Sequence, residues 1–328
     1  MSVRAATSTP HFQSHAEAMR DAATAAFAAD VLSGLTGSPK RLSPKYFYDA
    51  AGSELFEQIT RLPEYYPTRT ELGILRDQGA MIDAALPEKA ALIEFGAGSS
   101  TKARLLLEAK AFGAYVPVDI SGEFLNGQAA QLREDLPELP IHPVIADFTE
   151  PFTLPPVIEG MAKVGFFPGS TIGNFEPHEA SQLMRSMRDI LGDGSSLIIG
   201  VDLEKAEDIL RAAYNDEAGV TAKFDLNLLT RINHELGGTF DLNAFRHRAI
   251  YNRERHRIEM HLVSLAAQTV KVLGRTITFR AGETIHTENS YKYSLQRFAT
   301  LARSSGWRPV SSWTDAAAIF SVHLLRAD

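Results

Sequence analysis

The chain has 328 residues, of which 45% are hydrophobic and 22% charged, a composition typical of a globular protein with more than one domain. Its 33 basic and 40 acidic residues give a net charge of −7, whereas nucleic-acid-binding domains usually carry a basic face. The absence of cysteine excludes disulfides, thiolate metal sites and a cysteine nucleophile. No apolar run approaches the ~20 residues of a membrane span, and the N-terminus lacks the apolar stretch of a signal peptide. We therefore expect a cytoplasmic protein without a nucleic-acid or membrane partner.

The N-terminal part of the chain is predicted to contain one helix and one irregular segment. Residues 1–12 are polar, and we expect them to be disordered. Residues 15–35 are rich in alanine and place apolar side chains at helical spacing. Residues 40–71 are dense in aromatic side chains without a clear period, so we expect a loop-rich segment that forms the wall of a pocket.

Five strand-like runs follow, with helical stretches between them. They are residues 90–95, 114–119, 141–147, 164–170 and 196–202. A spacing of roughly 20–30 residues is typical of βαβ units in a parallel sheet. The helix before the fifth run, residues 176–191, opens with Glu176 and Pro177 and ends at Gly192, as helix-terminus preferences predict.

The pattern changes after Leu203. Helices are predicted within residues 204–236, and strands over residues 244–265, 270–279 and 283–292, where the alternation of Arg257-Ile-Glu-Met-His-Leu262 indicates an antiparallel sheet. A helix over residues 296–304 and two strands, 307–313 and 319–325, complete the chain. An antiparallel pair that closes a parallel sheet is typical of class I methyltransferases.

We therefore predict an α/β fold: a class I (Rossmann-like) methyltransferase sheet with an inserted α+β substrate-binding domain. Residues 71–203 and 293–328 are expected to form the cofactor-binding domain. Residues 13–70 and 204–292 are expected to form a second domain that caps it.

The first strand-like run leads into a helix through a turn with two glycines, Leu92-Ile-Glu-Phe-Gly-Ala-Gly-Ser-Ser-Thr-Lys102. Such a turn brings backbone N–H groups and a helix N-terminus close to a bound cofactor. The first three runs carry an acidic residue at or near their ends: Glu94, Asp119 and Asp147. This is the layout of an S-adenosylmethionine pocket, in which Asp119 accepts from ribose hydroxyls and Asp147 from the adenine amino group, with Phe148 beside the ring.

A sheet of this kind can also bind a nicotinamide dinucleotide. The G-x-G-x-x-G fingerprint fails at Thr101, and Asp147-Phe148 favours S-adenosylmethionine. The residues by themselves still leave open a dehydrogenase and a binding protein without catalysis. Taken singly, Asp119 or Asp147 is equally compatible with a helix cap. Lys102 lies in a first helical turn, where a cation is slightly unfavourable, which indicates a role such as binding the cofactor carboxylate.

Three polar segments are candidates for the acceptor site. Gly169-Ser-Thr-Ile-Gly-Asn174 follows the fourth strand, and its Asn side chain can donate to a carboxylate and accept from an amine. Tyr214-Asn-Asp-Glu-Ala-Gly219 is a polar stretch within the insertion. Thr287-Glu-Asn-Ser290 places Glu288 and Ser290 on one face of a strand.

The segment from Lys45 to Arg69, KYFYDAAGSELFEQITRLPEYYPTR, strongly resembles the histidine Nα-methyltransferase family of ergothioneine biosynthesis. Four further segments carry the same resemblance: Gly169–Asn174, Tyr214–Thr221, Arg257–Met260 and Thr287–Ser290. The resemblance covers nearly the whole chain from about Leu35. It implies that three molecules of S-adenosylmethionine methylate the α-amino group of L-histidine to give hercynine. Two departures, Gly-Ala-Gly-Ser-Ser in the glycine turn and Asn289 in the last segment, leave the Glu and Ser of that segment in place.

The resemblance also implies roles for individual residues. Cofactor contacts fall on Gly96, Lys102, Asp119, Asp147 and Phe148. The amino-acid head group would meet Tyr65, Asn174 and Tyr214, and the imidazole would meet Glu288 and Ser290, with Met260 packing nearby. Tyr48 would stand near the reacting nitrogen, which makes Tyr48 and Asn174 the catalytic candidates.

The chemistry of these side chains suits histidine. Glu288 can accept from an imidazole N–H while Ser290 serves the other nitrogen, and charge-assisted hydrogen bonds of this kind contribute about 1.5–3 kcal/mol. An aromatic ring such as Tyr48 tolerates the cationic product through cation–π attraction of about 0.5–2 kcal/mol. Tryptophan is the alternative acceptor, although the presence of Glu288 argues against it. No H-E-x-x-H is present, so we expect no metal, and we expect a monomer whose partner is a small-molecule substrate.

Overall fold

The structure, a computed structural model, describes residues 10–328, with side chains from residue 23 onward. Of the segment expected to be disordered, residues 1–9 lie outside the described residues, and residues 10–12 begin helix α1 (Pro10–Thr36) instead. The chain forms two compact units. The small unit contains the residues up to Phe47 with Asp225–Arg248 and His261–Glu288, and the large unit contains Tyr48–Phe224, Ala249–Met260 and Asn289–Asp328.

The two units do not follow the predicted domain limits. Residues 48–70, 204–224, 249–260 and 289–292, which the sequence assigns to the capping domain, group with the large unit. The division into a cofactor-binding and a substrate-binding domain therefore stays a prediction.

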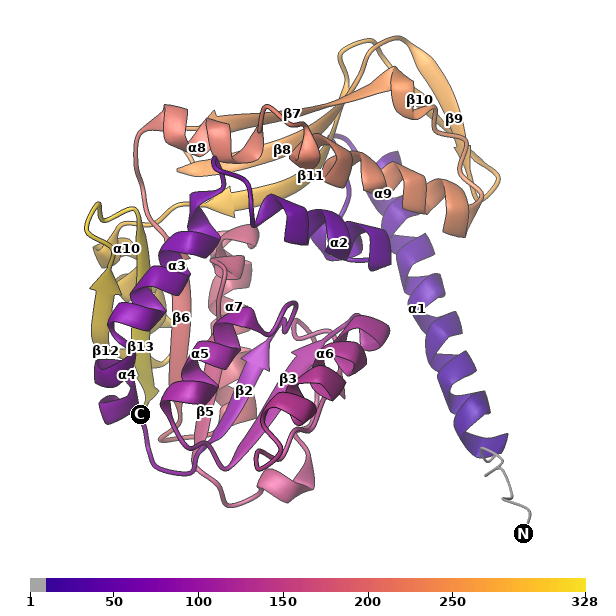
Figure 1. The fold of residues 1–328 in the computed structure, drawn as a ribbon. Coiled ribbons are helices and arrows are strands. Elements are labelled where there is room, and N and C mark those ends of the chain that lie inside the picture. Colours follow the sequence, from indigo (N-terminus) through magenta and orange to yellow (C-terminus); the bar gives the residue numbers. More distant parts are fainter. Residues whose placement is uncertain (1–9) are drawn as a thin grey trace. The chain divides into compact units, whose positions relative to one another are not determined.

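A seven-stranded sheet forms the centre of the large unit, in the order β12-β13-β6-β5-β2-β3-β4 (Figure 1). Its strands are β2 (Ala91–Phe95), β3 (Ala114–Asp119), β4 (Val144–Ile145), β5 (Lys163–Phe167), β6 (Ser196–Asp202), β12 (Trp307–Thr314) and β13 (Phe320–Ala327). Strands β2 to β6 pair in parallel, and β13 runs antiparallel to both β6 and β12. The predicted class I methyltransferase sheet is confirmed, including its closing antiparallel pair.

The strand order places the switch point of the sheet beside β2. From β2 the chain adds β3 and β4 on one side and then returns to add β5 and β6 on the other. In open α/β sheets, ligands bind outside the carboxyl ends of the strands at such a point. The glycine turn that follows β2 therefore lies where this topology predicts a ligand.

Helices cover both faces of this sheet (Figure 1). They include α3 (Tyr66–Asp77), α4 (Gly79–Ala85), α5 (Thr101–Ala109), α6 (Gly122–Asp135), α7 (Pro177–Leu191) and α10 (Leu295–Ser304). Ile93 of β2 belongs to a core with Met184 of α7 and Phe298 of α10. Leu92 belongs to a second core with Leu106 of α5. Because both faces are buried, the parallel strands read as continuous apolar runs.

The prediction of an irregular, loop-rich segment over residues 40–71 is wrong. The structure has β1 (Lys40–Arg41), a 3-10 turn η1 (Pro44–Phe47), helix α2 (Ala50–Ile59) and the start of α3 there. Helix α2 begins at Asp49, whose Oδ1 accepts from the backbone N–H of Gly52 at 2.7 Å. The density of aromatic side chains obscured this N-cap and the helical period that follows it.

Strand β4 is shorter than the predicted run of residues 141–147. Ile141 forms only an isolated bridge with Tyr115, and the ladder with β3 is limited to Val144 and Ile145. Pro143 lies between these two contacts and has no N–H to donate to a neighbouring strand.

A second sheet has the order β1-β11-β8-β7. Its longer strands are β7 (Phe245–Asn252), β8 (Arg257–Ser264) and β11 (Thr284–Tyr291), each of which has residues in both units. The remaining elements are α8 (Glu207–Tyr214), α9 (Val220–Leu236), β9 (Gln268–Val272), β10 (Arg275–Phe279) and the short 3-10 turns η2 (Pro156–Ile158), η3 (Thr171–Asn174) and η4 (Leu242–Ala244). Strands β9 and β10 form a hairpin whose turn residues Leu273 and Gly274 have φ of 49° and 73°, as a tight two-residue turn requires. Among the described residues, no helix is both long enough and apolar enough to cross a bilayer.

Candidate active site

The glycine turn after β2 is fixed between the ends of two strands. The backbone N–H groups of Gly96 and Ala97 both donate to the carbonyl of Val118 in β3, at 2.8 and 3.0 Å. Gly96 has φ of 75°, a conformation that favours glycine. A Cβ at this position would lie 3.2 Å from Cε1 of Phe148. The structure thus brings together Gly96 and Phe148, two predicted cofactor residues, and the missing side chain of Gly96 allows the ring of Phe148 to lie against the turn.

The two aspartates predicted to bind the cofactor also shape their own loops. Asp119 ends β3, and its Oδ1 accepts from the backbone N–H of Ser121 at 2.8 Å, just before α6. Partial burial raises the pKa of Asp119 above its ordinary value. Oδ1 of Asp147 accepts from the backbone N–H and the hydroxyl of Thr149, at 2.9 and 2.5 Å. Both carboxylates therefore stabilise local turns, and neither is the N-cap of a helix, the alternative that the sequence left open. Their contacts with a cofactor stay predictions.

Glu94 is not the strand tip that the sequence suggests. It lies within β2, is 1% exposed and accepts a hydrogen bond from the hydroxyl of Tyr115. Burial raises its pKa to about 8, against the opposing influence of Tyr115 and Lys102. The expected trio of acidic strand tips is therefore reduced to the pair Asp119 and Asp147.

The substitution Glu94→Gln should flatten the pH dependence of stability. The folded protein retains a proton on Glu94 up to about pH 8, whereas the unfolded chain releases it near the ordinary value of 4.5. The stabilising contribution of Glu94 is thus complete below the unfolded pKa and is lost as pH rises through the folded pKa. Urea denaturation over this pH range should show a steeper loss of stability for the wild type than for the glutamine variant. Parallel curves for the two proteins would contradict the raised pKa.

Lys102 forms an ion pair within the large unit. Its Nζ lies 2.6 Å from Oε2 of Glu71 on α3, a side chain that is fully buried. The two carboxylate oxygens of Glu71 also accept from the backbone N–H of Gly169, at 3.1 and 2.9 Å. Glu71 therefore joins the helix that follows the glycine turn to the loop that follows β5. Contact of Lys102 with a cofactor carboxylate stays a prediction.

The sequence reasoning missed Glu71, although a signal was present. On α3, Pro67, Glu71 and Ile74 are buried at helical spacing, so an acid occupies a core position. Gly200 of β6 is required beside it, because a Cβ there would overlap Oε1 of Glu71. A buried carboxylate with such neighbours indicates a specific partner.

Asn174 is placed by a tight turn at the carboxyl end of β5. Gly169 and Ser170 have φ of 80° and 58°, and the 3-10 turn η3 then runs from Thr171 to Asn174. A Cβ on Gly173 would lie 2.8 Å from the carbonyl oxygen of Tyr291, so this turn packs directly against the end of β11. The segment singled out in the sequence is therefore a structured loop at the ligand-binding edge of the sheet.

The three tyrosines predicted for the acceptor site belong to a cluster of aromatic rings in the large unit. The rings of Tyr65 and Tyr214 lie 6.4 Å apart, and Phe56 lies 6.2 Å from Tyr65. Tyr48 lies 5.6 Å from Phe56 and 5.8 Å from Phe224. The structure thus gathers Tyr214, at the end of α8, with Tyr48 and Tyr65, which lie in the connections before α2 and α3.

Tyr214 and Ser290 are in direct contact, although the family resemblance gives them different parts of the substrate. The hydroxyl oxygen of Tyr214 lies 2.7 Å from Oγ of Ser290. Nζ of Lys292 lies 2.6 Å from Oγ of Ser290 and 3.0 Å from the hydroxyl oxygen of Tyr214. Lys292 itself is fully buried.

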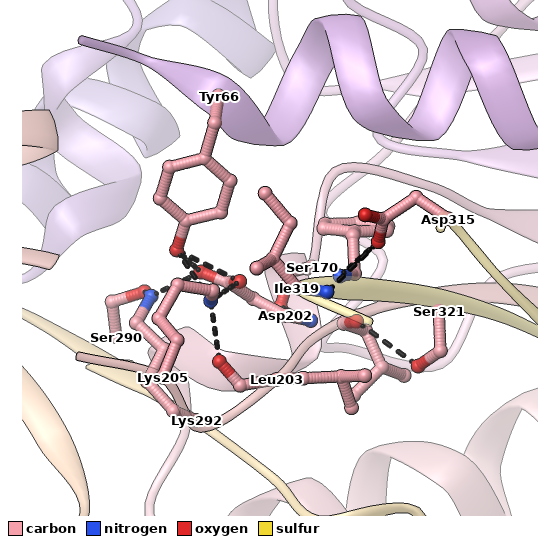
Figure 2. A network of polar contacts seen from close by, with 12 residues as sticks. Tyr66, Ser170, Asp202, Leu203, Lys205, Ser290, Lys292, Asp315, Ile319 and Ser321 are labelled. Atoms are coloured by element: carbon pink, nitrogen blue, oxygen red, sulfur yellow. Dashed lines mark hydrogen bonds and ion pairs between the residues drawn. The ribbon is translucent and has the colours of Figure 1, made fainter. Parts of the chain in front are cut away.

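Asp202, at the end of β6, compensates the charge of two lysines (Figure 2). Its Oδ1 lies 2.6 Å from Nζ of Lys205 and its Oδ2 lies 2.7 Å from Nζ of Lys292. The hydroxyl of Tyr66 donates to both oxygens, at 2.9 and 2.7 Å, and the backbone N–H of Asp202 donates to Oγ of Ser170 at 2.8 Å. The two ammonium groups hold the pKa of Asp202 below its ordinary value, while burial lowers the pKa of Lys205 to about 8.

This group of buried side chains was not predicted from the sequence. Asp202 stands at the end of the fifth strand, as Asp119 does for the second. Lys292 follows Ser290 by two residues in a strand-like segment, which places it on the same face. Both positions could be recognised in the sequence, but nothing in the sequence shows that Asp202 and Lys292 form an ion pair with each other.

Met260 and Glu288 lie on neighbouring strands of the second sheet, β8 and β11, and are 2% and 8% exposed. Glu288 and Ser290 are two residues apart on β11 and therefore share a face. The side-chain amide of Asn289, on the opposite face, donates to Oε1 of Glu176 at 3.4 Å. Contacts of Met260, Glu288 and Ser290 with an imidazole stay predictions.

Within the part of the chain that the structure describes, no three His, Cys, Asp or Glu side chains cluster as metal ligands would. This agrees with the expectation of a metal-free protein without testing it.

Comparison with known proteins shows the family of this chain. Residues 27–327 match the family described as histidine-specific, SAM-dependent methyltransferase. The chain is 42% and 41% identical over 310 residues to the histidine N-alpha-methyltransferases of Mycolicibacterium smegmatis and Mycobacterium tuberculosis, and each match covers 93% of this chain and 96% of the relative. It is 30% identical over 297 residues to ergothioneine biosynthesis protein 1 of Neurospora crassa, a match that covers 84% of this chain and 32% of that longer protein. The chain therefore belongs to the family of histidine-specific methyltransferases that use S-adenosylmethionine.

Proposed function

We propose that this methyltransferase acts on the α-amino group of L-histidine and repeats the transfer until the product is the trimethylated betaine hercynine. The observation that carries this proposal is the identity of 42% and 41%, over 93% of the chain, to two proteins named histidine N-alpha-methyltransferase. The similarity to ergothioneine biosynthesis protein 1 supports a place at the first step of ergothioneine formation.

The residues around the glycine turn fit S-adenosylmethionine. Because Gly96 has no side chain, the ring of Phe148 packs against the backbone of the glycine turn, which puts an aromatic side chain beside the expected adenine site. We assign the adenine amino group to Asp147, the adenine ring to Phe148, the ribose hydroxyls to Asp119 and the carboxylate to Lys102. When bound, the sulfonium supplies an activated methyl group.

The substitution Asp119→Ala should weaken cofactor binding at least about tenfold, because a carboxylate that accepts from ribose hydroxyls contributes about 1.5–3 kcal/mol. The fold should survive, since Asp119 is partly exposed and its described hydrogen bonds are local. Calorimetric titration with S-adenosylhomocysteine measures the affinity, and circular dichroism checks the fold. Wild-type affinity in the variant would refute the ribose assignment.

We assign the head group of histidine to Tyr65, Asn174 and Tyr214, and its imidazole to Glu288 and Ser290, with Met260 packing against it. The protein has to hold the unprotonated amine in line with the methyl group, and positioning of this kind supplies much of the rate in such reactions. Tyr48 and Asn174 are assigned to the reacting nitrogen. The face of Tyr48 accommodates the accumulating positive charge of the product.

Mass spectrometry tests the proposed acceptor. Purified protein is incubated with S-adenosylmethionine and, in separate reactions, with histidine, tyrosine or tryptophan. We expect three successive methyl increments on histidine alone. Increments on tryptophan alone would instead favour the alternative aromatic acceptor. Ligand binding without any increment would indicate a binding protein without catalysis.

We further propose a cytoplasmic monomer that requires no metal and has no nucleic-acid or membrane partner. The net charge of −7 supports the lack of a nucleic-acid partner. Light scattering should give the mass of one chain, and activity should persist after treatment with a chelator. A dimer in solution would overturn the proposal of a monomer. An activity that a chelator removes and a metal restores would overturn the proposal that no metal is required.

A further inference from the structure

We infer that Lys292 is a positioning residue that fixes Ser290 as a hydrogen-bond donor, so that the site admits neutral imidazole and discriminates against imidazolium. The inference rests on the proposed function, since it concerns how the same site recognises histidine. It adds a residue that touches no substrate but determines which protonation state of the substrate fits.

The geometry around Ser290 leaves few arrangements of hydrogen bonds. A lysine ammonium has three donors and no acceptor. Nζ of Lys292 lies 2.6 Å from Oγ of Ser290 and 3.0 Å from the hydroxyl oxygen of Tyr214, so both oxygens accept from it. The two oxygens are themselves 2.7 Å apart, so one hydroxyl donates to the other.

The direction of that last hydrogen bond determines what Ser290 offers. A hydroxyl has one donor proton and two acceptor lone pairs. When Tyr214 donates to Ser290, Lys292 and Tyr214 together occupy both lone pairs of Oγ. The proton of Ser290 is then directed to a third group.

Neutral imidazole is such a third group, and imidazolium is not. The neutral ring has one acceptor nitrogen, which takes the proton of Ser290, and one N–H, which the carboxylate of Glu288 accepts. Imidazolium has two N–H donors and no acceptor. One of its N–H groups would face the donor Ser290 and, behind it, the cation of Lys292.

Lys292 is paired with a buried carboxylate (Figure 2). It is fully buried and lies 2.7 Å from Oδ2 of Asp202, whose pKa the two neighbouring lysines lower. The titratable side chains that act on Lys292 from adjoining elements are Asp202 on β6, Lys205 after it, Tyr214 on α8 and Tyr251 on β7. Tyr66 on α3 contacts Asp202 and Lys205. Burial raises the pKa of Tyr66 and Tyr251, and the pKa of Lys205 is about 8. The imidazole of histidine, with an ordinary pKa near 6.5, becomes charged below about pH 7.

The test is the pH dependence of KM for histidine in the variant Lys292→Met. In the wild type, KM should rise about tenfold per pH unit below about pH 6.5, because only the neutral ring binds. In the variant, Ser290 loses a donor and regains an acceptor lone pair. Its KM should be about tenfold higher at about pH 7.5. Below about pH 6.5 it should lack the additional tenfold rise per pH unit that the wild type shows beyond the titration of the substrate α-amino group, which affects both proteins.

Lys205→Met is the matched control. It also removes a buried lysine paired with Asp202, but Nζ of Lys205 contacts Tyr66, Asp202 and the carbonyl of Leu203 rather than Ser290 or Tyr214. This variant should lose stability and retain the wild-type rise of KM at low pH. A purely structural role of Lys292 predicts the same behaviour for both variants.

Ser290→Ala serves if Lys292→Met does not fold, because it leaves the ion pair of Lys292 and Asp202 in place. It should also lose the additional rise of KM at low pH. The inference is overturned if Lys292→Met, or Ser290→Ala in its place, retains the wild-type pH profile, or if the wild type methylates histidine with a KM that does not rise below about pH 6.5. A folded wild type that methylates no histidine at any pH would instead refute the proposed function.

Discussion

The substitution Asp202→Ala should destabilise the protein by about 3–5 kcal/mol, the range expected when one partner of a buried ion pair is removed. Asp202 is 1% exposed, and it is the carboxylate partner of both Lys205 and Lys292, whose side chains are 4% and 0% exposed. Alanine would leave two buried ammonium groups without this counter-charge and would remove an acceptor of the Tyr66 hydroxyl. Urea denaturation near neutral pH measures the loss.

Two further variants separate the charge from the loss of side-chain volume. Asp202→Asn keeps the shape and an acceptor oxygen, so it should cost less than alanine while still losing the charge. Adding Lys205→Met to Asp202→Ala should recover part of the stability, because one uncompensated charge is removed, and a double-mutant cycle quantifies the coupling.

A surface ion pair supplies the reference. Nε of Arg308 lies 3.0 Å from Oδ2 of Asp328, and the two side chains are 56% and 60% exposed. Because solvent screens their attraction, Arg308→Ala should change the free energy of unfolding by less than about 1 kcal/mol. If Asp202→Ala were as mild as this exposed variant, the charges assigned to the buried group would be wrong.

The substitution Glu288→Ala should raise KM for histidine about tenfold or more, with a smaller effect on kcat. A carboxylate that accepts from an imidazole N–H contributes about 1.5–3 kcal/mol, and a contact made equally in the ground and transition states appears in KM. Glu288 is only 8% exposed, so water replaces its hydrogen bond poorly. Steady-state kinetics with saturating S-adenosylmethionine measures both constants.

Matched variants on the same strand sharpen this measurement. Glu288→Gln keeps the shape and one acceptor oxygen, and its KM should lie between those of the wild type and the alanine variant. Asn289→Ala changes the opposite face of β11, where the side chain contacts Glu176, and KM should stay at the wild-type value. An unchanged KM in Glu288→Ala would show that Glu288 does not contact the ring.

The predicted elements were most accurate where the local pattern was strong. The parallel strands are apolar because both of their faces are buried, and such runs need no knowledge of the partner strand. The prediction failed over residues 40–71, where α2 begins at the N-cap Asp49 amid many aromatic side chains. The prediction also overestimated the length of β4, because Pro143 interrupts the hydrogen bonds to β3.

The site was predictable only in part, for a related reason. Sequence motifs single out residues to which a ligand contact can be assigned one at a time, such as Gly96 or Glu288, because each has a recognisable local setting. Glu71 and Lys292 act through partners, Lys102 and Asp202, that are 31 and 90 residues away along the chain. No local pattern encodes such pairs.

The sequence by itself determined the parallel sheet with its closing antiparallel pair, the glycine turn and the family, because periodicity, turn chemistry and segment similarity are properties of neighbouring residues. Only the tertiary structure decided the surroundings of the charged groups: that burial raises the pKa of Glu94, that Lys102 pairs with Glu71, and that Asp202 pairs with two buried lysines, one of which contacts Tyr214 and Ser290. The physical reason is that the ionisation and hydrogen-bond direction of a buried group depend on desolvation and on distances of a few ångströms, which exist only once distant segments have packed together.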